Sequence, residues 1–351
     1  MDNNFKKHLF NHNKSAREAL IQLEKLGFDA ILFIVDENEF LMGSLTDGDI
    51  RRGLIGDKNI DESVLKFIQN NPKYLRKGDE DIYKIQYLKN QNFRIIPILN
   101  KNDNKVIKVI NFRKLKSYLP IDALVMAGGK GQRLRPLTNT KPKPLLNVGE
   151  KPIIEHNIDR LIMFGIDDIN ISVNYLGEQI VDYFNDGIQK GVNIHYVWEK
   201  VPLGTIGSIT LVENFLHDYI LITNSDILTN LDYENFFINF LENGADFSVV
   251  TIPYEVKVPY AVLESRDGQI IDFKEKPTFT YYSNGGIYLM KKELIKYIPK
   301  DVLFDATDFM QKMIDLEKKI ISYPFSGYWL DIGKIDDFNK AQIDIKNINF
   351  L

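Results

Sequence analysis

Short apolar runs alternate with amphipathic segments through the second half of the chain. Four runs have the pattern of buried strands, at residues 123–127, 169–173, 194–198 and 219–223. Helical spacing of apolar side chains extends over residues 153–164, 178–184 and 206–215. This alternation predicts an α/β fold, in which a mostly parallel sheet has helices on both faces and binds its ligand at the carboxyl ends of the strands.

The first half has a repeated pattern of its own. Residues 27–34 can be aligned with residues 92–99, and residues 41–45 with residues 106–110, at a constant shift of 65 positions. Each copy predicts a helix, a buried strand, a turn, a second strand and a helix, which indicates an internal duplication. A charged segment, Pro120 and a new apolar strand follow, so two domains are predicted, at residues 1–119 and 120–351.

Composition narrows the class of protein. The 351 residues are 44% hydrophobic, which is enough for two domains with sizeable cores. No cysteine is present, and this excludes disulfides, thiolate catalysis and cysteine-ligated zinc. The N-terminal residues lack a secretory segment, and the apolar runs are too short to cross a bilayer. We therefore expect a cytoplasmic protein with no membrane partner.

A glycine-rich loop with several cations follows the strand predicted at residues 123–127. Gly128, Gly129 and Gly131 lack a Cβ, so successive backbone N–H groups can face an anion at close range. Five basic residues lie in the same stretch, namely Lys130, Arg133, Arg135, Lys141 and Lys143. Because the formal net charge of the chain is −4, this local cluster favours a small phosphorylated ligand over a nucleic-acid surface.

The order of residues distinguishes this loop from two common phosphate-binding loops. It lacks the Gly-Lys-Ser/Thr ending of a Walker loop, and Leu134 stands where a dinucleotide loop has its third glycine. Instead, residues 128–138 read Gly-Gly-x-Gly-x-Arg-Leu-x-Pro-Leu-Thr, and residues 141–145 read Lys-Pro-x-Pro-Leu. On these motifs, residues 122–351 resemble the sugar-nucleotide pyrophosphorylases, which are sugar-1-phosphate nucleotidyltransferases with a Rossmann-like sheet.

The resemblance implies how this stretch would bind a nucleoside triphosphate. Loop backbone groups would contact the nucleotide at Ala127, Gly128, Gly129 and Gly131. Arg133 would hold the triphosphate and Lys143 the α-phosphate. A sugar 1-phosphate is largely ionised at neutral pH, so its oxygen can attack the α-phosphorus without a protein nucleophile. The protein would neutralise and position the anions.

Two aspartates are candidates for a Mg²⁺ site. Asp226 ends an apolar run at a predicted strand end, and Asp331 lies in the segment 328–333. In the resembled family these two carboxylates bind Mg²⁺, and hard oxygen ligands suit this ion. Either aspartate alone is also compatible with a helix cap or a turn.

Three further residues are expected at the sugar. Glu275 and Lys276 match a Glu-Lys-Pro element of the family, in which the lysine meets the sugar phosphate and the glutamate a sugar hydroxyl. Asn284 begins the strand that, by the same resemblance, lines the sugar pocket. Ala261 stands where the family commonly has glycine, which leaves the identity of the sugar open.

Residues 198–207, with Glu199, Gly204 and Thr205, correspond to the family's base-reading loop. A carboxylate only accepts hydrogen bonds, and guanine offers two adjacent donors, whereas the single imide N–H of uracil lies between two carbonyls. Glu199 therefore favours GTP. The alternative is a solvent-facing Glu199, with the base read by backbone groups such as those of Gly204 and with UTP, dTTP or CTP as the substrate.

The first domain resembles a CBS domain pair, on the spacing of Gly43, Thr46 and Asp49. In that family the threonine and aspartate hold the ribose of an adenine nucleotide, here AMP or ATP. The second copy departs from the motif with Lys108, Asn111 and Lys114. The alternative is a docking or dimerisation module in which Thr46 caps a helix and Asp49 complements its dipole. Both family resemblances imply a homodimer.

A CBS pair joined to a transferase of this size resembles the bacterial guanylyltransferases of legionaminic acid biosynthesis. This implies glucosamine 1-phosphate as the sugar substrate, although mannose, heptose or glucose 1-phosphate would use the same residues. A hypothesis from another class is a catalytically silent, nucleotide-sensing regulator. The presence of Arg133, Lys143, Asp226, Lys276 and Asp331 favours the enzyme.

Overall fold

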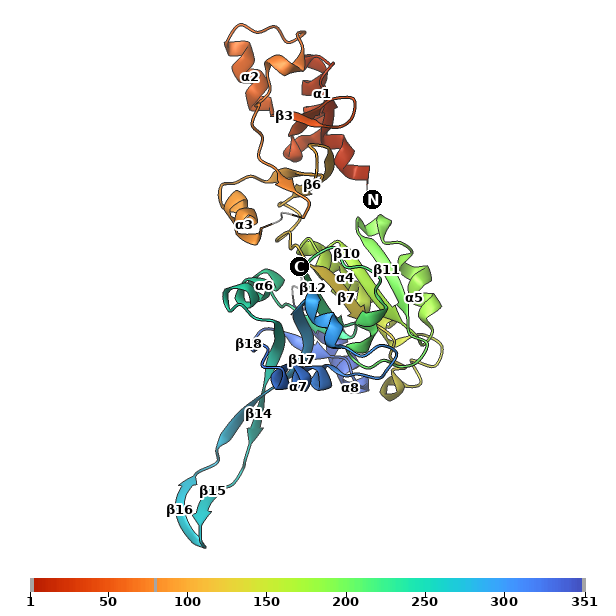
Figure 1. Ribbon diagram of the computed structural model, residues 1–351, viewed down its shortest axis with the longest axis vertical. Coiled ribbons are helices and arrows are strands. Elements are labelled where there is room, and N and C mark those ends of the chain that lie inside the picture. Colours follow the sequence, from red (N-terminus) through yellow and green to blue (C-terminus); the bar gives the residue numbers. More distant parts are fainter. Residues whose placement is uncertain (1–2, 79–80, 349–351) are drawn as a thin grey trace. The chain divides into compact units, whose positions relative to one another are not determined.

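Two units make up the chain (Figure 1). The computed structural model describes residues 3–78 and 81–348. Unit 1 comprises Met1–Pro120, Ile162–Asp167 and Asp186–Asn193, and unit 2 comprises Ile121–Leu161, Asp168–Asn185 and Ile194–Leu351. Within the described ranges, no helix combines the length and the apolar character needed to cross a membrane.

Unit 1 contains two three-stranded sheets of the same design. The first consists of β1 (Leu9–Asn11), β2 (Leu32–Val35) and β3 (Leu41–Leu45), and the second of β4 (Leu75–Arg76), β5 (Ile95–Leu99) and β6 (Val106–Asn111). In each sheet the first pair of strands is parallel and the second pair antiparallel. Its α-helices are α1 (Ala16–Leu26), α2 (Asp47–Ile55) and α3 (Ile82–Asn90), and its short 3-10 helices are η1 (Asn3–His8), η2 (Gly27–Asp29) and η3 (Val64–Lys66).

The paired sheets agree with a duplication, but two details of the predicted repeat are wrong. Ile34 pairs with Gly43 and Ile98 with Lys108, each just before a register irregularity. The shift is therefore 64 residues for the first strand (98 − 34) and 65 for the second (108 − 43). The helix expected after the second copy is also missing, because residues 112–114 form a turn after Asn111, whose side chain accepts the Arg113 N–H at 2.9 Å.

A seven-stranded sheet forms the centre of unit 2. Its strands lie in the order β11-β10-β7-β12-β17-β14-β18. Their bounds are β7 (Asp122–Met126), β10 (Asp168–Val173), β11 (Asn193–Trp198), β12 (Tyr219–Asn224), β14 (Phe247–Lys257), β17 (Thr278–Lys291) and β18 (Ile320–Pro324). β7 is parallel to β10 and β12, and β14 is parallel to β18, whereas β17 runs antiparallel to both of its neighbours. The sheet is thus mostly parallel, as predicted.

The other elements of unit 2 are α-helices, small two-stranded ladders and short 3-10 helices. Its α-helices are α4 (Ile153–Met163), α5 (Gly177–Phe184), α6 (Tyr233–Glu242), α7 (Ala306–Asp315) and α8 (Ile335–Asp344). Two-stranded ladders join β8 (Asn147–Val148) to β9 (Lys151–Pro152) and β13 (Ile227–Thr229) to β19 (Trp329–Asp331). The 3-10 helices of unit 2 are η4 (Gln132–Leu134), η5 (Lys143–Leu145), η7 (Gly207–Leu211) and η8 (Lys292–Tyr297), whereas η6 (Ile188–Lys190) belongs to unit 1.

The α-helix expected over residues 206–215 is wrong. Only the short 3-10 helix η7 forms there. Several β-branched residues crowd this stretch and lose rotamer freedom in an α-helix, and the Thr210 hydroxyl donates to the Gly207 carbonyl at 2.8 Å. The apolar spacing therefore reflects burial of Ile206 and Ile209, both 0% exposed, and not a full helix.

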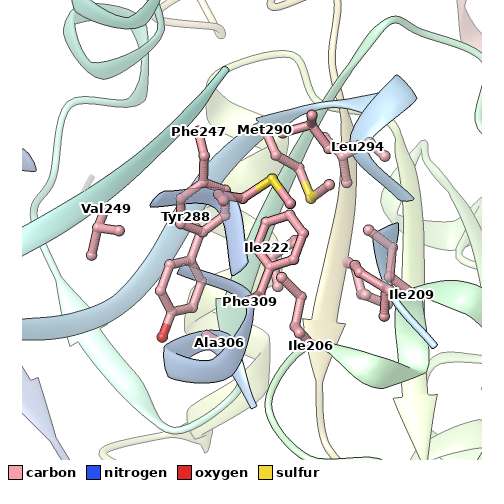
Figure 2. Close-up of a cluster of buried hydrophobic side chains, with 14 of the residues drawn as sticks. Ile206, Ile209, Ile222, Phe247, Val249, Tyr288, Met290, Leu294, Ala306 and Phe309 are labelled. Carbon is pink, nitrogen blue, oxygen red and sulfur yellow. The ribbon is translucent and has the colours of Figure 1, made fainter. Parts of the chain in front are cut away.

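A hydrophobic cluster fixes β12 and β17 against α7 (Figure 2). Phe247 stacks on Tyr288 with ring centroids 5.7 Å apart, and the Phe309 ring meets Phe247 edge-on at 5.2 Å. Phe309 is fully buried, and truncation of such a ring to alanine costs about 3–5 kcal/mol. The Tyr288 hydroxyl accepts a hydrogen bond from Asn284 Nδ2 at 2.8 Å, which links this core to the cavity described below.

β14 and β17 continue past the sheet as a two-stranded arm, defined here as residues 253–282 (Figure 1). The arm ends in the hairpin of β15 (Val262–Arg266) and β16 (Gln269–Lys274). Asp267 and Gly268 make the two-residue turn, with φ of 52° and 82°. Positive φ at both positions is the geometry of a type I′ hairpin turn. Most side chains of the arm are exposed on both faces.

Candidate active site

Two aspartates far apart in sequence are brought together by the small β13–β19 ladder. Ile227, which follows Asp226, pairs with Asp331, and the Ile332 N–H donates to the Asp226 carbonyl at 3.0 Å. Lys143 forms an ion pair with Asp226 Oδ2, and its Nζ lies 4.0 Å from Asp331 Oδ1. The predicted catalytic lysine and both predicted metal ligands therefore share one location.

This pair of carboxylates fits a hard divalent cation. Asp226 Oδ1 is buried and has no hydrogen-bond partner among the described residues. Burial, followed by the charge of Asp226, raises the pKa of Asp331 above its ordinary value. A cation that takes oxygen ligands would stabilise the buried acceptor that has no donor. It would also reduce the repulsion between the two carboxylates. Asp226 and Asp331 are therefore able to hold a hard divalent cation.

The glycine loop begins where β7 ends, directly beside β10. The Ala127 N–H donates to the Ser172 carbonyl at 2.9 Å, so it is occupied by the sheet. Gly131 has φ of 58°, and a Cβ there would lie 2.9 Å from the Lys143 Cβ. A side chain at Gly131 would therefore displace Lys143 from the aspartates. Gly129 has open space around it and is free to face a ligand.

The five loop cations do not converge on one point. Lys143 is 9% exposed and pairs with Asp226, whereas Lys130 and Arg135 are exposed. Arg133 lies close to Asp331, since its charge lowers the pKa of that carboxyl in opposition to burial and Asp226. A Cβ at Gly333 would also lie 3.2 Å from Arg133 Nη2. Of the loop cations, Arg133 and Lys143 are thus the two placed at the acidic pair.

Glu199 is buried, at 9% exposure, and so the solvent-facing alternative is wrong. Its Oε1 accepts from the Ser172 hydroxyl at 2.6 Å, and its Oε2 accepts from the Leu203 N–H at 3.1 Å. A Cβ at Gly128 would lie 2.9 Å from Glu199 Oε1, so this carboxylate lies against the glycine loop. Each carboxylate oxygen keeps a further lone pair for a ligand donor.

A cavity of about 330 Å³ opens beside the aspartates. Asn284, Gly285 and Gly286 of β17 form one wall, and Thr205, Asp305 and Thr307 form another. Trp329 and Asp331 close the side toward the acidic pair, with Trp329 Nε1 donating to the Gly285 carbonyl at 2.9 Å. Polar and apolar groups line the cavity about equally, which suits a hydroxylated substrate.

The predicted base-reading loop is anchored at the start of α7. The Thr205 N–H and hydroxyl both contact Asp305 Oδ1, at 2.9 and 3.1 Å, and the Ala306 N–H donates to Thr205 Oγ1 at 2.8 Å. Gly204 has φ of 78°, and a Cβ there would lie 2.7 Å from the Phe304 carbonyl oxygen. Thr205 thus lies at the cavity, while Gly204 allows the loop to approach α7.

Glu275 and Lys276 are not brought to the cavity of their own chain. Both are exposed, in the elbow between β16 and β17. Thr278 pairs with Lys257 on the arm, and six residues of extended strand separate it from Asn284, a distance of about 20 Å. Within one chain, Glu275 and Lys276 therefore lie apart from Asn284, the third residue predicted at the sugar. Ala261 is likewise exposed on the arm and does not line the cavity.

Thr46 and Asp49 form the capping box of α2 in unit 1. The Thr46 hydroxyl donates to Asp49 Oδ2 at 2.6 Å, and the Thr46 N–H donates to the same oxygen at 2.8 Å. Asp49 Oδ1 accepts from Arg52 and from Gln69 Nε2, the latter at 2.8 Å. Burial alone would raise the pKa of Asp49, but these hydrogen bonds together lower it. The contacts that the structure shows for Thr46 and Asp49 are those of a helix cap, the alternative to a nucleotide site.

Three residues at the cavity were missed by the sequence interpretation. They are Tyr288, Asp305 and Trp329. Asp305 carried a recognisable signal, because an acidic residue followed three positions later by Asp308 begins an amphipathic helix as a capping box does. Tyr288 and Trp329 had no such signal, since aromatic residues in strands usually belong to the core.

A separate cluster of two aspartates and a histidine lies at the amino ends of β7, β10 and β12, away from the glycine loop at the carboxyl end of β7. Asp122 begins β7, Asp168 begins β10, and His217 precedes β12, with one ligand atom of each within 4.8 Å of the others. The Asp122 carboxylate accepts the His217 N–H at 2.8 Å and lies 3.2 Å from its Nδ1. These contacts fix the entry of the chain into β12, which gives the group a structural role.

The comparisons with known proteins agree with this site. A family model of nucleotidyl transferases matches residues 122–348. The chain is 31% identical over 233 residues to the D-glycero-alpha-D-manno-heptose 1-phosphate guanylyltransferase of Aneurinibacillus thermoaerophilus, an alignment that covers 65% of this chain and 99% of that protein. It is 32% identical over 251 residues to the UTP--glucose-1-phosphate uridylyltransferase of Synechocystis sp., covering 64% of this chain and 65% of that protein.

Among solved structures, the chain is similar to HddC from Yersinia pseudotuberculosis complexed with GMP-PN. The TM-score is 0.50 and the identity 26%, with 64% of this chain and 99% of that chain covered. The chain spans less than two thirds of some longer relatives, such as 62% of the mannose-1-phosphate guanylyltransferase catalytic subunit beta of Dictyostelium discoideum. Since the family model covers well over half of the residues, the chain belongs to the nucleotidyl transferase family.

Proposed function

We propose that this protein is a sugar-1-phosphate guanylyltransferase, which joins GMP from GTP to a sugar 1-phosphate and releases pyrophosphate. The observation that carries the proposal is the meeting of Lys143, Asp226 and Asp331 beside the glycine loop, with Asp226 Oδ1 buried and without a donor. Such a set of charges neutralises and positions two phosphate groups, which is the main requirement of this reaction.

In the proposed reaction, an ionised oxygen of the sugar phosphate attacks the α-phosphorus of GTP. The bond from the α-phosphorus to the bridging oxygen breaks, and pyrophosphate leaves in line with the electron pair of that bond. Arg133 and Lys143 offset the repulsion between the anions, and the loop around Gly129 donates backbone N–H groups to the triphosphate. A Mg²⁺ ion held by Asp226 and Asp331 would stabilise the negative charge that develops on the phosphate oxygens.

GTP is the nucleotide that the available observations favour. Each Glu199 oxygen already accepts one hydrogen bond, from Ser172 or Leu203, and keeps a further lone pair, so the carboxylate can still accept the two donors of guanine. The relatives from Aneurinibacillus and Dictyostelium are named guanylyltransferases, and the HddC structure contains GMP-PN. The second candidate is UTP, which the name of the Synechocystis relative supports.

For the sugar, we propose glucosamine 1-phosphate, with supply of a nucleotide sugar to legionaminic acid synthesis. The support is the resemblance of a CBS-like first half joined to this transferase. Heptose 1-phosphate is the second candidate, since the Aneurinibacillus relative is named for it. The cavity wall of Asn284, Thr205 and Asp305 provides amide, hydroxyl and carboxylate groups for sugar hydroxyls.

The test is release of pyrophosphate with Mg²⁺ and a panel of substrates. GTP and UTP are each paired with glucosamine, mannose and heptose 1-phosphates. We expect release with GTP and glucosamine 1-phosphate, and a loss of at least about 10²-fold in the Asp226→Asn variant. Asp315→Asn, an exposed aspartate at the end of α7, is the matched control. Release only with UTP would overturn the nucleotide, and no release with any pair would overturn the function.

For unit 1, we propose AMP or ATP as the ligand of a regulatory site near Thr46 and Asp49, within a homodimer. The resemblance to the CBS family supports the ligand, and the second reading, a docking unit, is supported by the capping box that occupies both side chains. A regulatory site and a docking unit predict different effects of Asp49→Ala on the binding of AMP or ATP.

A further inference from the structure

The arm of residues 253–282 lacks the packing that a pair of strands needs. Its exposed apolar side chains include Tyr254, Leu263, Phe273 and Tyr281, which are between 55% and 63% exposed. Tyr254 pairs across the ladder with Tyr281, and Leu263 with Phe273, so these side chains lie on shared faces. An isolated two-stranded hairpin is marginal in water, and its outer edges are unpaired. The arm therefore requires a partner surface.

The cavity beside Asp331 is also incomplete. Its lining contains two carboxylates, Asp305 and Asp331, and no lysine or arginine among the described residues. Of the two loop cations at the acidic pair, Lys143 is already paired with Asp226 and Arg133 lies close to Asp331, so neither is free of a carboxylate. If the proposed function holds, the phosphate of the sugar must lie close to this acidic lining, where an additional cation is needed to offset the repulsion.

The arm carries a cation, Lys276, that cannot reach the cavity of the same chain. β17 is one continuous strand, with its register to β14 intact from Thr278 to Asn284. This ladder holds Lys276 more than about 20 Å from Asn284, because each strand residue advances the chain by about 3.3 Å. Lys276 is exposed and has the chemistry that the cavity lacks.

We propose that two copies of this chain exchange their arms, so that Lys276 of one copy completes the sugar-phosphate end of the other copy's cavity. A two-fold exchange satisfies both needs at once, because each arm covers its apolar faces on the partner while each cavity gains a cation. The inference rests on the proposed function for the role of Lys276. The exchange of arms itself can be tested without activity.

The activity test mixes two defective variants. Lys276→Ala removes the arm cation and Asp226→Asn disables the cavity, and each variant alone should lose at least about 10²-fold of the activity. In a mixed dimer, the intact cavity of the Lys276→Ala chain receives the intact arm of the Asp226→Asn chain. Random pairing makes half of the dimers mixed, with one complete site each, so the mixture should recover about a quarter of the wild-type activity.

A chain that uses its own arm would show no recovery in that mixture, which would overturn the proposal. Lys257→Ala, another exposed lysine of the arm, is the matched control and should keep wild-type activity. If the wild-type protein itself releases no pyrophosphate, the proposed function fails, and the arm is then judged by cross-linking alone.

The cross-linking test uses the absence of native cysteine. Lys276→Cys and Thr307→Cys are combined in one chain and treated with a short bismaleimide, Thr307 being exposed at the cavity. Exchange of arms predicts a product of twice the 40.7 kDa chain, both from this double variant and from a mixture of the two single variants. A product that remains at the mass of one chain, linked internally, would show that the arm serves its own cavity.

Discussion

At the scale of single residues, the candidate active site contains carboxylates whose negative charges are only partly neutralised by lysine and arginine. Burial and then the charge of Asp226 raise the pKa of Asp331, and Lys143, which pairs with Asp226 and lies 4.0 Å from Asp331, offsets this only in part. The ionised form of Asp331 is therefore disfavoured in the folded protein, while Asp226 Oδ1 has no donor. A site with this imbalance is less stable without a cation than with one, and this links metal binding to the stability of unit 2.

Asp331→Asn should therefore stabilise the metal-free protein at neutral pH. Because the folded-state pKa of Asp331 is raised, wild-type stability is lost as the pH rises through that pKa. The variant has no such titration, so its advantage in Tm should grow from pH 4 toward pH 7. Mg²⁺ should raise the Tm of the wild type but have little effect on the variant. Thermal melts with EDTA or Mg²⁺ measure both effects, and an equal Mg²⁺ shift in the two proteins would contradict the assignment.

At the scale of elements, the sequence predicts a helix or strand correctly where a single physical cause, such as burial on both faces, determines its pattern. The strands at 123–127, 169–173 and 219–223 are buried on both faces, so their apolar runs are unambiguous. The stretch at 206–215 is apolar because its side chains are buried, and its apolar spacing wrongly predicts an α-helix. The arm was also missed, although Asp267-Gly268 is a strong hairpin signal, because no pattern within a strand shows that both of its faces are exposed.

The same limit applies to the site. The glycine loop, Asp226 and Asp331 are read from local motifs, and the structure brings them together through pairing of β13 with β19. The separation of Lys276 from Asn284 depends instead on the register of a long ladder, which local sequence does not encode. Burial of Glu199 similarly depends on Ser172 and Leu203, which reach it from β10 and from its own loop.

The α2 capping box offers a test of the two readings of unit 1. Asp49→Ala removes the acceptor of Thr46, Gln69 and Arg52, so it should lower the stability of unit 1 by about 1–3 kcal/mol. Asp47→Ala, an exposed acidic residue in the same helix turn, is the control. Calorimetric titration with AMP and ATP then separates the readings. Binding by the wild type that is lost in Asp49→Ala supports the regulatory site, whereas no binding by the wild type supports a docking unit.

At the scale of the whole molecule, each unit contains a histidine with a lowered pKa, buried in the case of His8 and half-buried in the case of His156. In unit 1, burial lowers the pKa of His8, whose Nδ1 is 3.0 Å from the Ile31 carbonyl oxygen. In unit 2, burial lowers the pKa of His156, whose Nε2 is 2.9 Å from the Val148 carbonyl oxygen. Nearby carboxylates raise the pKa of each ring, Asp29 for His8 and Asp159 and Glu155 for His156, but they do not outweigh the effect of burial. Acid should therefore weaken both units, each through its own histidine.

The pH dependence follows from these two pKa values. A lowered folded-state pKa means that the unfolded chain binds the proton first, so stability is full above about pH 6.5 and falls as the pH decreases below it. His156→Gln keeps an N–H donor for Val148 without titration and should flatten the profile of unit 2. Both tryptophans, Trp198 and Trp329, lie in unit 2, so urea unfolding followed by their fluorescence reports on that unit.

His8→Asn is the matched variant for unit 1, and it should leave the tryptophan profile unchanged while flattening the decline measured by far-UV circular dichroism. His195→Gln, at an exposed position in β11, is the control for a change of histidine as such. If His156→Gln loses stability between pH 7 and pH 5 as steeply as the wild type, the burial of that ring is not the source of acid sensitivity. Separate responses of the two probes would show that the units unfold as independent bodies, each with its own acid limit.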